Sequence, residues 1–361
     1  MARSARLRLV SVSLGAAVAI SAVVTVAGRA SSSPQLPTIS PQALLASAIR
    51  AADTNGPPVS GRVTAHLDLG LPSLPDALAG RGPGGLSSLL SELSGDHHFR
   101  VWGSSDGIRV AELLPAAERS LIASTTDAWA WDSTTFTAYH LGSIPKLEAP
   151  NLSTPSISPD LVDPQRRAQE ALAAVEPTTA VSVGPTARIA GRASYVLVIE
   201  PRSTTTLVGR IEIGIDADTR VPLSVTVFPA GSARVAIRVA FTSVGFGPID
   251  PKMFTFTPPA GATVVTPSHP APGSEGSERQ PPIAPTGVPQ VFDTGWSTVV
   301  AVPVTVLADL RTSAPGKALA DLLPFSGRLF SVRLLDRGDH AWLLAGLVPQ
   351  SALAAAGSEL P

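Results

Sequence analysis

The chain has 361 residues with a formal net charge of −1, and 15% of its residues are charged. That balance leaves no excess of positive charge to bind nucleic acid, which is therefore excluded as a partner. The sequence contains no cysteine, which excludes disulfides, thiol catalysis, cysteine-rich zinc sites and a lipid-modified cysteine.

The first predicted element is an export segment. Three arginines within the first eight residues precede an apolar run over residues 9–27, the order found in a signal peptide. Residues 1–30 are predicted to be a signal peptide cleaved after Ala30, or an uncleaved N-terminal membrane anchor. In either case the bulk of the chain is extracytoplasmic, in the cell envelope, because the basic residues stay inside.

A Ser/Pro-rich tether over residues 31–40 leads into the first helix. Ser40 and Pro41 form a helix start, and apolar residues follow at helical spacing as far as Ala52. Strict alternation over residues 59–69 then predicts a long strand with one buried face. Residues 71–95, rich in Pro, Gly, Ser and Leu, are interpreted as an insertion or flap.

Two groups of short alternating segments follow, separated by turn residues, and each group predicts an antiparallel meander. The first comprises residues 96–102, 108–114, 119–124, 128–131 and 136–141. Strands return at Ala180, and the second group continues with residues 194–200, 207–215, 221–228 and 233–244. Between the meanders, residues 164–175 are predicted to form a second short helix after Asp163.

The domain over residues 41–265 ends at a Pro/Gly-rich linker, residues 266–290. Residues 291–361 form a small C-terminal α/β module with a strand near 296–306, a hairpin over 329–335 and 341–347, and an Ala-rich helix. The fold class is mainly β (α+β). It is a curved, unclosed antiparallel sheet of about eleven strands with a short helical lid, plus this module.

The predicted helices are too small to cover one face of so large a sheet. A sheet of that size curls under its own twist. If it is incompletely filled, it leaves an apolar groove of the kind that binds small molecules or lipids. The alternative is that the face is ordinary core, closed by the curvature and by residues 71–95.

Four short strings carry a resemblance to a known family: Ser105-Asp106-Gly107-Ile108, Ala128-Trp129-Ala130-Trp131-Asp132, Leu207-Val208-Gly209-Arg210-Ile211 and Phe254-Thr255-Phe256-Thr257-Pro258-Pro259. Over residues 41–265 the chain resembles the LolA-like superfamily, which includes the lipoprotein carrier LolA and the RseB-like sigma-factor regulators. The resemblance implies an unclosed half-barrel whose apolar concave face is lidded by helices. It also implies a carrier or a sensor of acyl chains.

Two strings that suggest chemistry are better explained by structure. Gly103-Ser104-Ser105-Asp106-Gly107 fits G-x-S-x-G, but it joins two short strands and is interpreted as a hairpin turn. His97 and His98 are adjacent in a strand and so point to opposite faces, which disfavours a shared metal ion. The chain is therefore predicted not to be an enzyme and to need no cofactor or metal.

The large side chains best able to line an apolar cavity are aromatic. These candidate ligand-binding residues are Phe99, Trp102, Trp129, Trp131, Tyr195, Phe228 and Phe241. Trp129 and Trp131 share a face whereas Phe99 lies opposite Trp102, so the set cannot line one cavity together. Sheet core is the alternative interpretation of all seven.

The sequence favours an exported lipid- or lipoprotein-binding carrier that holds acyl chains in a half-barrel cavity. Its partner would be a lipid or an acylated polypeptide. The alternative is an RseB-like envelope sensor or regulator that contacts a membrane protein.

Overall fold

The structure, a computed structural model, describes residues 33–53, 56–71, 93–142, 177–266, 283–285, 288–306, 323–337 and 341–360. The predicted export segment, most of the predicted flap, the predicted helix over residues 164–175 and most of the linker lie outside these residues.

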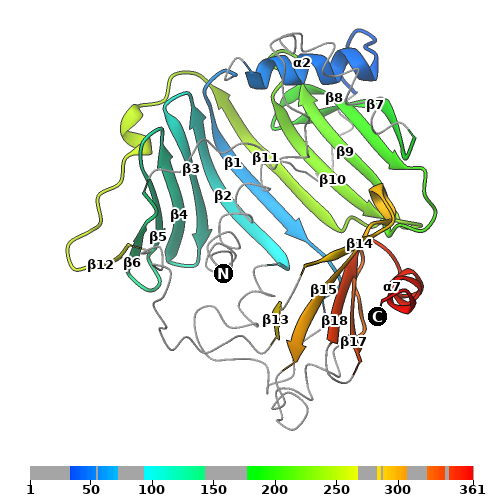
Figure 1. The fold of residues 1–361 in the computed structure, drawn as a ribbon. Coiled ribbons are helices and arrows are strands. Elements are labelled where there is room, and N and C mark those ends of the chain that lie inside the picture. Colours follow the sequence, from blue (N-terminus) through cyan, green and yellow to red (C-terminus); the bar gives the residue numbers. More distant parts are fainter. Residues whose placement is uncertain are drawn as a thin grey trace, which may run out of the picture.

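The larger sheet has twelve strands in the order β12-β6-β5-β4-β3-β2-β1-β11-β10-β9-β8-β7 (Figure 1). The strands are β1 Val59–Leu67, β2 Gly95–Ser104, β3 Gly107–Leu114, β4 Ala117–Ser124, β5 Ala128–Asp132, β6 Thr137–His140, β7 Thr179–Ile189, β8 Arg192–Pro201, β9 Val208–Asp216, β10 Pro222–Pro229, β11 Ile237–Phe246 and β12 Thr263–Val265. All neighbours are antiparallel except β12, which pairs with β6 in parallel. Within the described residues β7 and β12 are opposite edges, so the sheet is unclosed.

The predicted fold class is confirmed. Both meanders form as predicted, with the order β2 to β6 in one half and β7 to β11 in the other. Strand β1 joins the halves by pairing with β2 on one side and β11 on the other. The additional strand is β12, whose three residues are too few for an alternation pattern to reveal.

Helix α2, Pro41–Asp53, packs against one face of the large sheet (Figure 1). Its start is capped as predicted, because the Oγ of Ser40 accepts a hydrogen bond from the backbone N–H of Ala43 at 3.2 Å. Leu44, fully buried, packs with Tyr195 and Leu197, so the apolar stripe of the helix covers β8 and its neighbours.

The C-terminal module contains a second sheet in the order β13-β15-β18-β17-β16, with β14 also pairing with β15. Its elements are β13 Ile283–Pro285, β14 Gln290–Phe292, β15 Val299–Val306, β16 Phe325–Ser326, β17 Ser331–Asp336, β18 Ala341–Gly346 and helix α7 Gln350–Ser358. Leu353 of α7 packs against Val299 and Leu344. β13 and Gln290 fall within the range assigned from the sequence to the linker, yet both pair with β15.

The module docks on one end of the large sheet. The backbone N–H of Leu207, just before β9, donates to the carbonyl of Leu347 at 2.7 Å. Arg328 Nε donates to Asp68 Oδ1, just after β1, at 2.9 Å. The apolar centre of this interface is Val208, Ala236 and Leu329, with Leu69, Ile211, Val227, Ile237 and Trp296 packed around it. The two sheets are therefore held together by both backbone hydrogen bonds and a buried apolar cluster.

Candidate functional site

The strand register places a continuous apolar row on one face of the large sheet. It aligns one residue from each of five neighbouring strands: Leu197, Ile213, Val225, Val239 and Ala65. Leu197 packs against α2, so we call this the helix-side face and the other the opposite face. The sequence alternation that predicted one apolar and one polar face is what produces this row.

Towards β1 to β4 the helix-side face remains apolar, and part of it is accessible to solvent. The residues concerned are only half-buried: Val59, Phe99, Ile108 and Leu121. Val63, Val101 and Val110, beside them, are buried and form the main core cluster. This part of the helix-side face therefore offers apolar side chains with accessible surface, which is the property required to bind an apolar ligand.

Charged residues cross the same face beside Phe99. The register aligns Phe99 with Glu112, Arg119 and Asp132 on successive strands. Glu112 pairs with His97, Oε1 to Nδ1 at 2.8 Å, with only 16% and 14% of their side chains exposed. Arg119 Nε lies 3.3 Å from Asp132 Oδ2. The helix-side face is therefore amphipathic, with an apolar field that borders a charged row.

The seven aromatic candidates divide between the two faces. Phe99, Tyr195 and Phe241 lie on the helix-side face, and Trp102, Trp129, Trp131 and Phe228 lie on the opposite face. Phe99 and Trp102 are thus on opposite faces, and Trp129 and Trp131 share one, as the sequence predicted. Tyr195 and Phe241 are 4% and 2% exposed and belong to the packed core, whereas Phe99 is half-buried.

The opposite face carries an aromatic cluster near its β5–β6 edge. The rings of Trp129 and Trp131 lie 5.6 and 5.7 Å from that of Phe256, which follows the short 3₁₀ helix η1, Pro251–Phe254. His140 stacks on Trp129 at 4.3 Å. The segment after η1 therefore packs against these tryptophans, which explains why they are only half-buried rather than exposed.

Asp127 joins two members of this cluster. Its carboxylate accepts hydrogen bonds from Trp129 Nε1 at 2.8 Å and pairs with His140 Nε2 at 2.7 Å. Partial burial raises the pKa of Asp127, but these contacts stabilise the carboxylate and lower its pKa overall. The contacts orient the aromatic rings and bring no nucleophile to the histidine.

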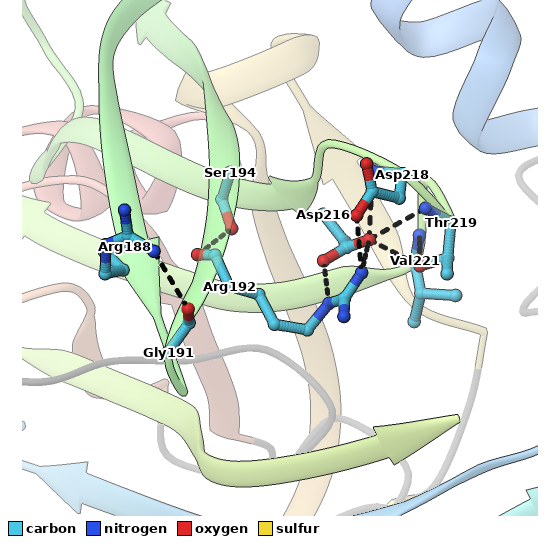
Figure 2. A network of polar contacts seen from close by, with 8 residues as sticks. All are labelled: Arg188, Gly191, Arg192, Ser194, Asp216, Asp218, Thr219 and Val221. Atoms are coloured by element: carbon cyan, nitrogen blue, oxygen red, sulfur yellow. Dashed lines mark hydrogen bonds and ion pairs between the residues drawn. The ribbon is translucent and has the colours of Figure 1, made fainter. Parts of the chain in front are cut away.

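A charged network fixes the end of the β7–β8 hairpin to the turn between β9 and β10 (Figure 2). The carboxylate of Asp216, which is fully buried, accepts hydrogen bonds from both Nε and Nη2 of Arg192, the second at 2.9 Å. It also accepts the backbone N–H of Thr219 at 2.7 Å and the Thr219 hydroxyl at 2.9 Å. Asp218, 85% exposed, receives Nη2 of the same arginine at 2.9 Å.

Burial raises the pKa of Asp216, but the hydrogen bonds from Arg192 and Thr219 outweigh burial and lower the pKa below its ordinary value. The same contact with Asp216 raises the pKa of Arg192. Arg192 also lies 5.0 Å above the ring of Phe246, and Arg220 lies 5.0 Å above that of Tyr195. Through Arg192 the network therefore also contacts an aromatic ring of β11. In the sequence, the only sign of this Arg192–Asp216 network is an Asp-rich turn.

The G-x-S-x-G string and the adjacent histidines His97 and His98 both lie in the β2–β3 hairpin. Ser104 to Gly107 form the turn between β2 and β3, where Ser104 Oγ accepts the backbone N–H of Asp106 at 3.1 Å, so the hairpin-turn interpretation is confirmed. His97 pairs with Glu112 on the helix-side face, while His98 lies exposed on the other. Among the described residues no group of three or more His, Cys, Asp or Glu is placed to hold a metal ion.

No helix within the described ranges combines the length and apolar character needed to cross a membrane.

No family model matches the sequence. No curated protein matches it either. Solved structures do match. The complex of MucA and MucB from Pseudomonas aeruginosa matches at 14% identity and a TM-score of 0.40, over 86% of this chain and 94% of that one. An uncharacterised conserved protein from Thermus thermophilus matches at 11% identity and a TM-score of 0.35, over 61% and 97%.

A LolA-superfamily protein from Nitrosomonas europaea matches at 10% identity and a TM-score of 0.23, over 61% of this chain and 99% of that one.

Proposed function

We propose that the protein is an exported, non-enzymatic carrier of the cell envelope that binds an acyl chain of a lipid or lipidated polypeptide on the helix-side face. The observation that supports this most is the field of half-buried apolar side chains over β1 to β4, next to the charged row that begins at Glu112. An amphiphile suits such a surface. Each methylene group removed from water contributes about 0.8 kcal/mol, and the polar head can meet the charged row.

Strand β2 allows a matched test of which face binds. Phe99 and Trp102 are both half-buried aromatics of the same strand, one on each face. We expect Phe99→Ser to weaken the binding of a fluorescent fatty acid to residues 31–361 about tenfold, because a buried Phe contributes roughly 1.5–3 kcal/mol. Trp102→Ser is the control and should bind as the unchanged protein does.

Equal losses in both variants, at equal thermal stability, would contradict an acyl site on the helix-side face. Native mass spectrometry of the unchanged protein provides the second measurement. Lipid that co-purifies with residues 31–361 supports the carrier, whereas a protein that is lipid-free and also fails to bind the fatty acid refutes it.

A second candidate function is a regulator that contacts a membrane protein through the C-terminal module. It is favoured by two valines that lie opposite each other on β14 and β15, Val291 and Val300, which are 63% and 37% exposed. Contiguous exposed apolar surface marks protein contacts, and these two valines are neighbours on the sheet. Val291→Asp with Val300→Asp should abolish capture of a partner from solubilised envelope membranes while fatty-acid binding persists, and undiminished capture would exclude this surface.

A further inference from the structure

Two arginines lie directly opposite each other on the opposite face of the large sheet. Arg62 of β1 and Arg100 of β2 are register partners, and both are exposed. Side chains at directly opposite positions of antiparallel strands start about 5 Å apart, and like charges there destabilise the sheet. The pair therefore costs stability unless something neutralises it.

No carboxylate of the described residues does so. In the part of the chain that the structure describes, neither Arg62 nor Arg100 has an ion pair, whereas Arg109 on the next strand pairs with Glu118 at 3.3 Å. The neighbours of the two arginines on the same face are neutral or basic: Ser60, Thr64, His98, Trp102, Arg109, Ala111 and Ser243. Because Glu118 neutralises Arg109, the two arginines without an ion pair in this group are Arg62 and Arg100.

The chemistry of this group suits an oxyanion. Each guanidinium offers a planar fork of N–H donors that matches phosphate oxygens in a bidentate manner. Ser60, Thr64 and Ser243 occupy neighbouring positions on the same face, and their hydroxyls can donate further hydrogen bonds. A carboxylate neighbour would repel an anion, and the positions directly beside Arg62 and Arg100 on β1, β2, β3 and β11 contain none. Glu118, on the same face of β4, is paired with Arg109.

We propose that Arg62 and Arg100 form a binding site for a phosphate-type anion, held between the two guanidinium groups. The site lies on the face opposite to α2, so it is separate from the acyl site proposed above and does not depend on it. The anion is either a soluble phosphate or the phosphate of a lipid headgroup, since both present the same oxygens.

Two probes distinguish these sources at constant ionic strength: inorganic phosphate, measured by calorimetry, and vesicles of phosphatidylglycerol in phosphatidylcholine, measured by co-sedimentation against vesicles of phosphatidylcholine alone. The test variant carries Arg62→Gln and Arg100→Gln. The control carries Arg188→Gln and Lys252→Gln, which removes the same charge from two other exposed positions of the described chain.

We expect the test variant to bind at least one probe about tenfold or more weakly than the unchanged protein, because charge-assisted hydrogen bonds are lost. The control should stay within about twofold, since a general charge effect is screened by salt. Loss confined to phosphate identifies a soluble ligand, and loss confined to the vesicles identifies a headgroup. Absence of binding by the unchanged protein to both probes, or equal weakening in the two variants, overturns the proposal.

Thermal unfolding gives an independent readout. In chloride buffer the test variant should unfold at the same temperature as the unchanged protein or higher, because the repulsion between Arg62 and Arg100 is removed. Added phosphate should raise the unfolding temperature of the unchanged protein and of the control, but not that of the test variant. A phosphate-induced rise of equal size in all three proteins contradicts the site.

Discussion

Removal of the Asp216 carboxylate should strongly destabilise the half of the sheet from β7 to β11. Asp216 is fully buried and binds Arg192 through two nitrogens, Thr219 through two donors and the backbone N–H of Asp218 at 3.1 Å. Loss of one partner of a buried ion pair costs about 3–5 kcal/mol. Arg192 is 30% exposed and keeps its contact with Asp218, so we expect Asp216→Ala to cost about 3 kcal/mol, the lower end of that range.

Asp218→Ala is the matched control, because Asp218 binds the same arginine but is 85% exposed. An exposed ion pair contributes about 0–1 kcal/mol, so this variant should unfold almost as the unchanged protein does. The free energy of unfolding is measured by urea denaturation followed by circular dichroism. If both aspartate variants lose the same stability, or Asp216→Ala loses less than about 1 kcal/mol, burial of the carboxylate is not what stabilises the turn.

The pH dependence of the same pair has a defined sign. The pKa of Asp216 is lower in the folded protein than its ordinary value of 3.8, so the carboxylate contributes stability above that pH. This contribution is lost as the pH falls through the ordinary value and then through the lower folded pKa. The stability difference between the unchanged protein and Asp216→Ala should therefore be constant near neutral pH and shrink below pH about 4. A difference that grows on acidification would refute the assignment.

Three further substitutions test the packing. Gly214→Ala should cost about 1–3 kcal/mol in urea denaturation, because its new methyl group would overlap Ile189; an unchanged midpoint would mean that β9 has room there. Asp68→Ala should speed hydrogen exchange of the Arg328 amide at the module interface, because the ion pair with Arg328 is lost. The free energy of unfolding should fall by at most about 1 kcal/mol. Exchange at the original rate would show that the ion pair is dispensable. Leu44→Ala should cost about 2–5 kcal/mol, since the side chain is fully buried, and a loss below this would place α2 outside the core.

Most of what could be predicted about the large sheet came from the alternation of apolar and polar residues along each strand. Ile211, Ile213 and Ile215 alternate with polar residues in the sequence, and in β9 they lie together on the helix-side face. The same period-two argument separated Phe99 from Trp102 correctly. Alternation does not say which strand lies next to which, and the pairing of β1 with β11 depends on contacts far apart in the chain.

The features that the sequence did not reveal depend on long-range geometry. Arg328 meets Asp68 across 260 positions, so no local pattern could place the module on the end of the large sheet. Burial of Asp216 was equally hidden, because an Asp at the end of a strand is ordinarily exposed and its burial is tolerable through donors from Arg192, Asp218 and Thr219. The opposed arginines became visible only once the register of β1 and β2 was known.

The two proposed sites meet on strand β2, where Phe99 and Arg100 are consecutive residues that point to opposite faces. Because the sheet backbone separates them, a substitution of one side chain should leave binding at the other unchanged. We expect Phe99→Ser to keep full phosphate or vesicle binding, and Arg100→Gln to keep full fatty-acid binding, each measured at equal thermal stability. Parallel loss at both sites would mean that the substitutions distort β2 itself, whereas independent losses would show two ligands on the two faces of one sheet.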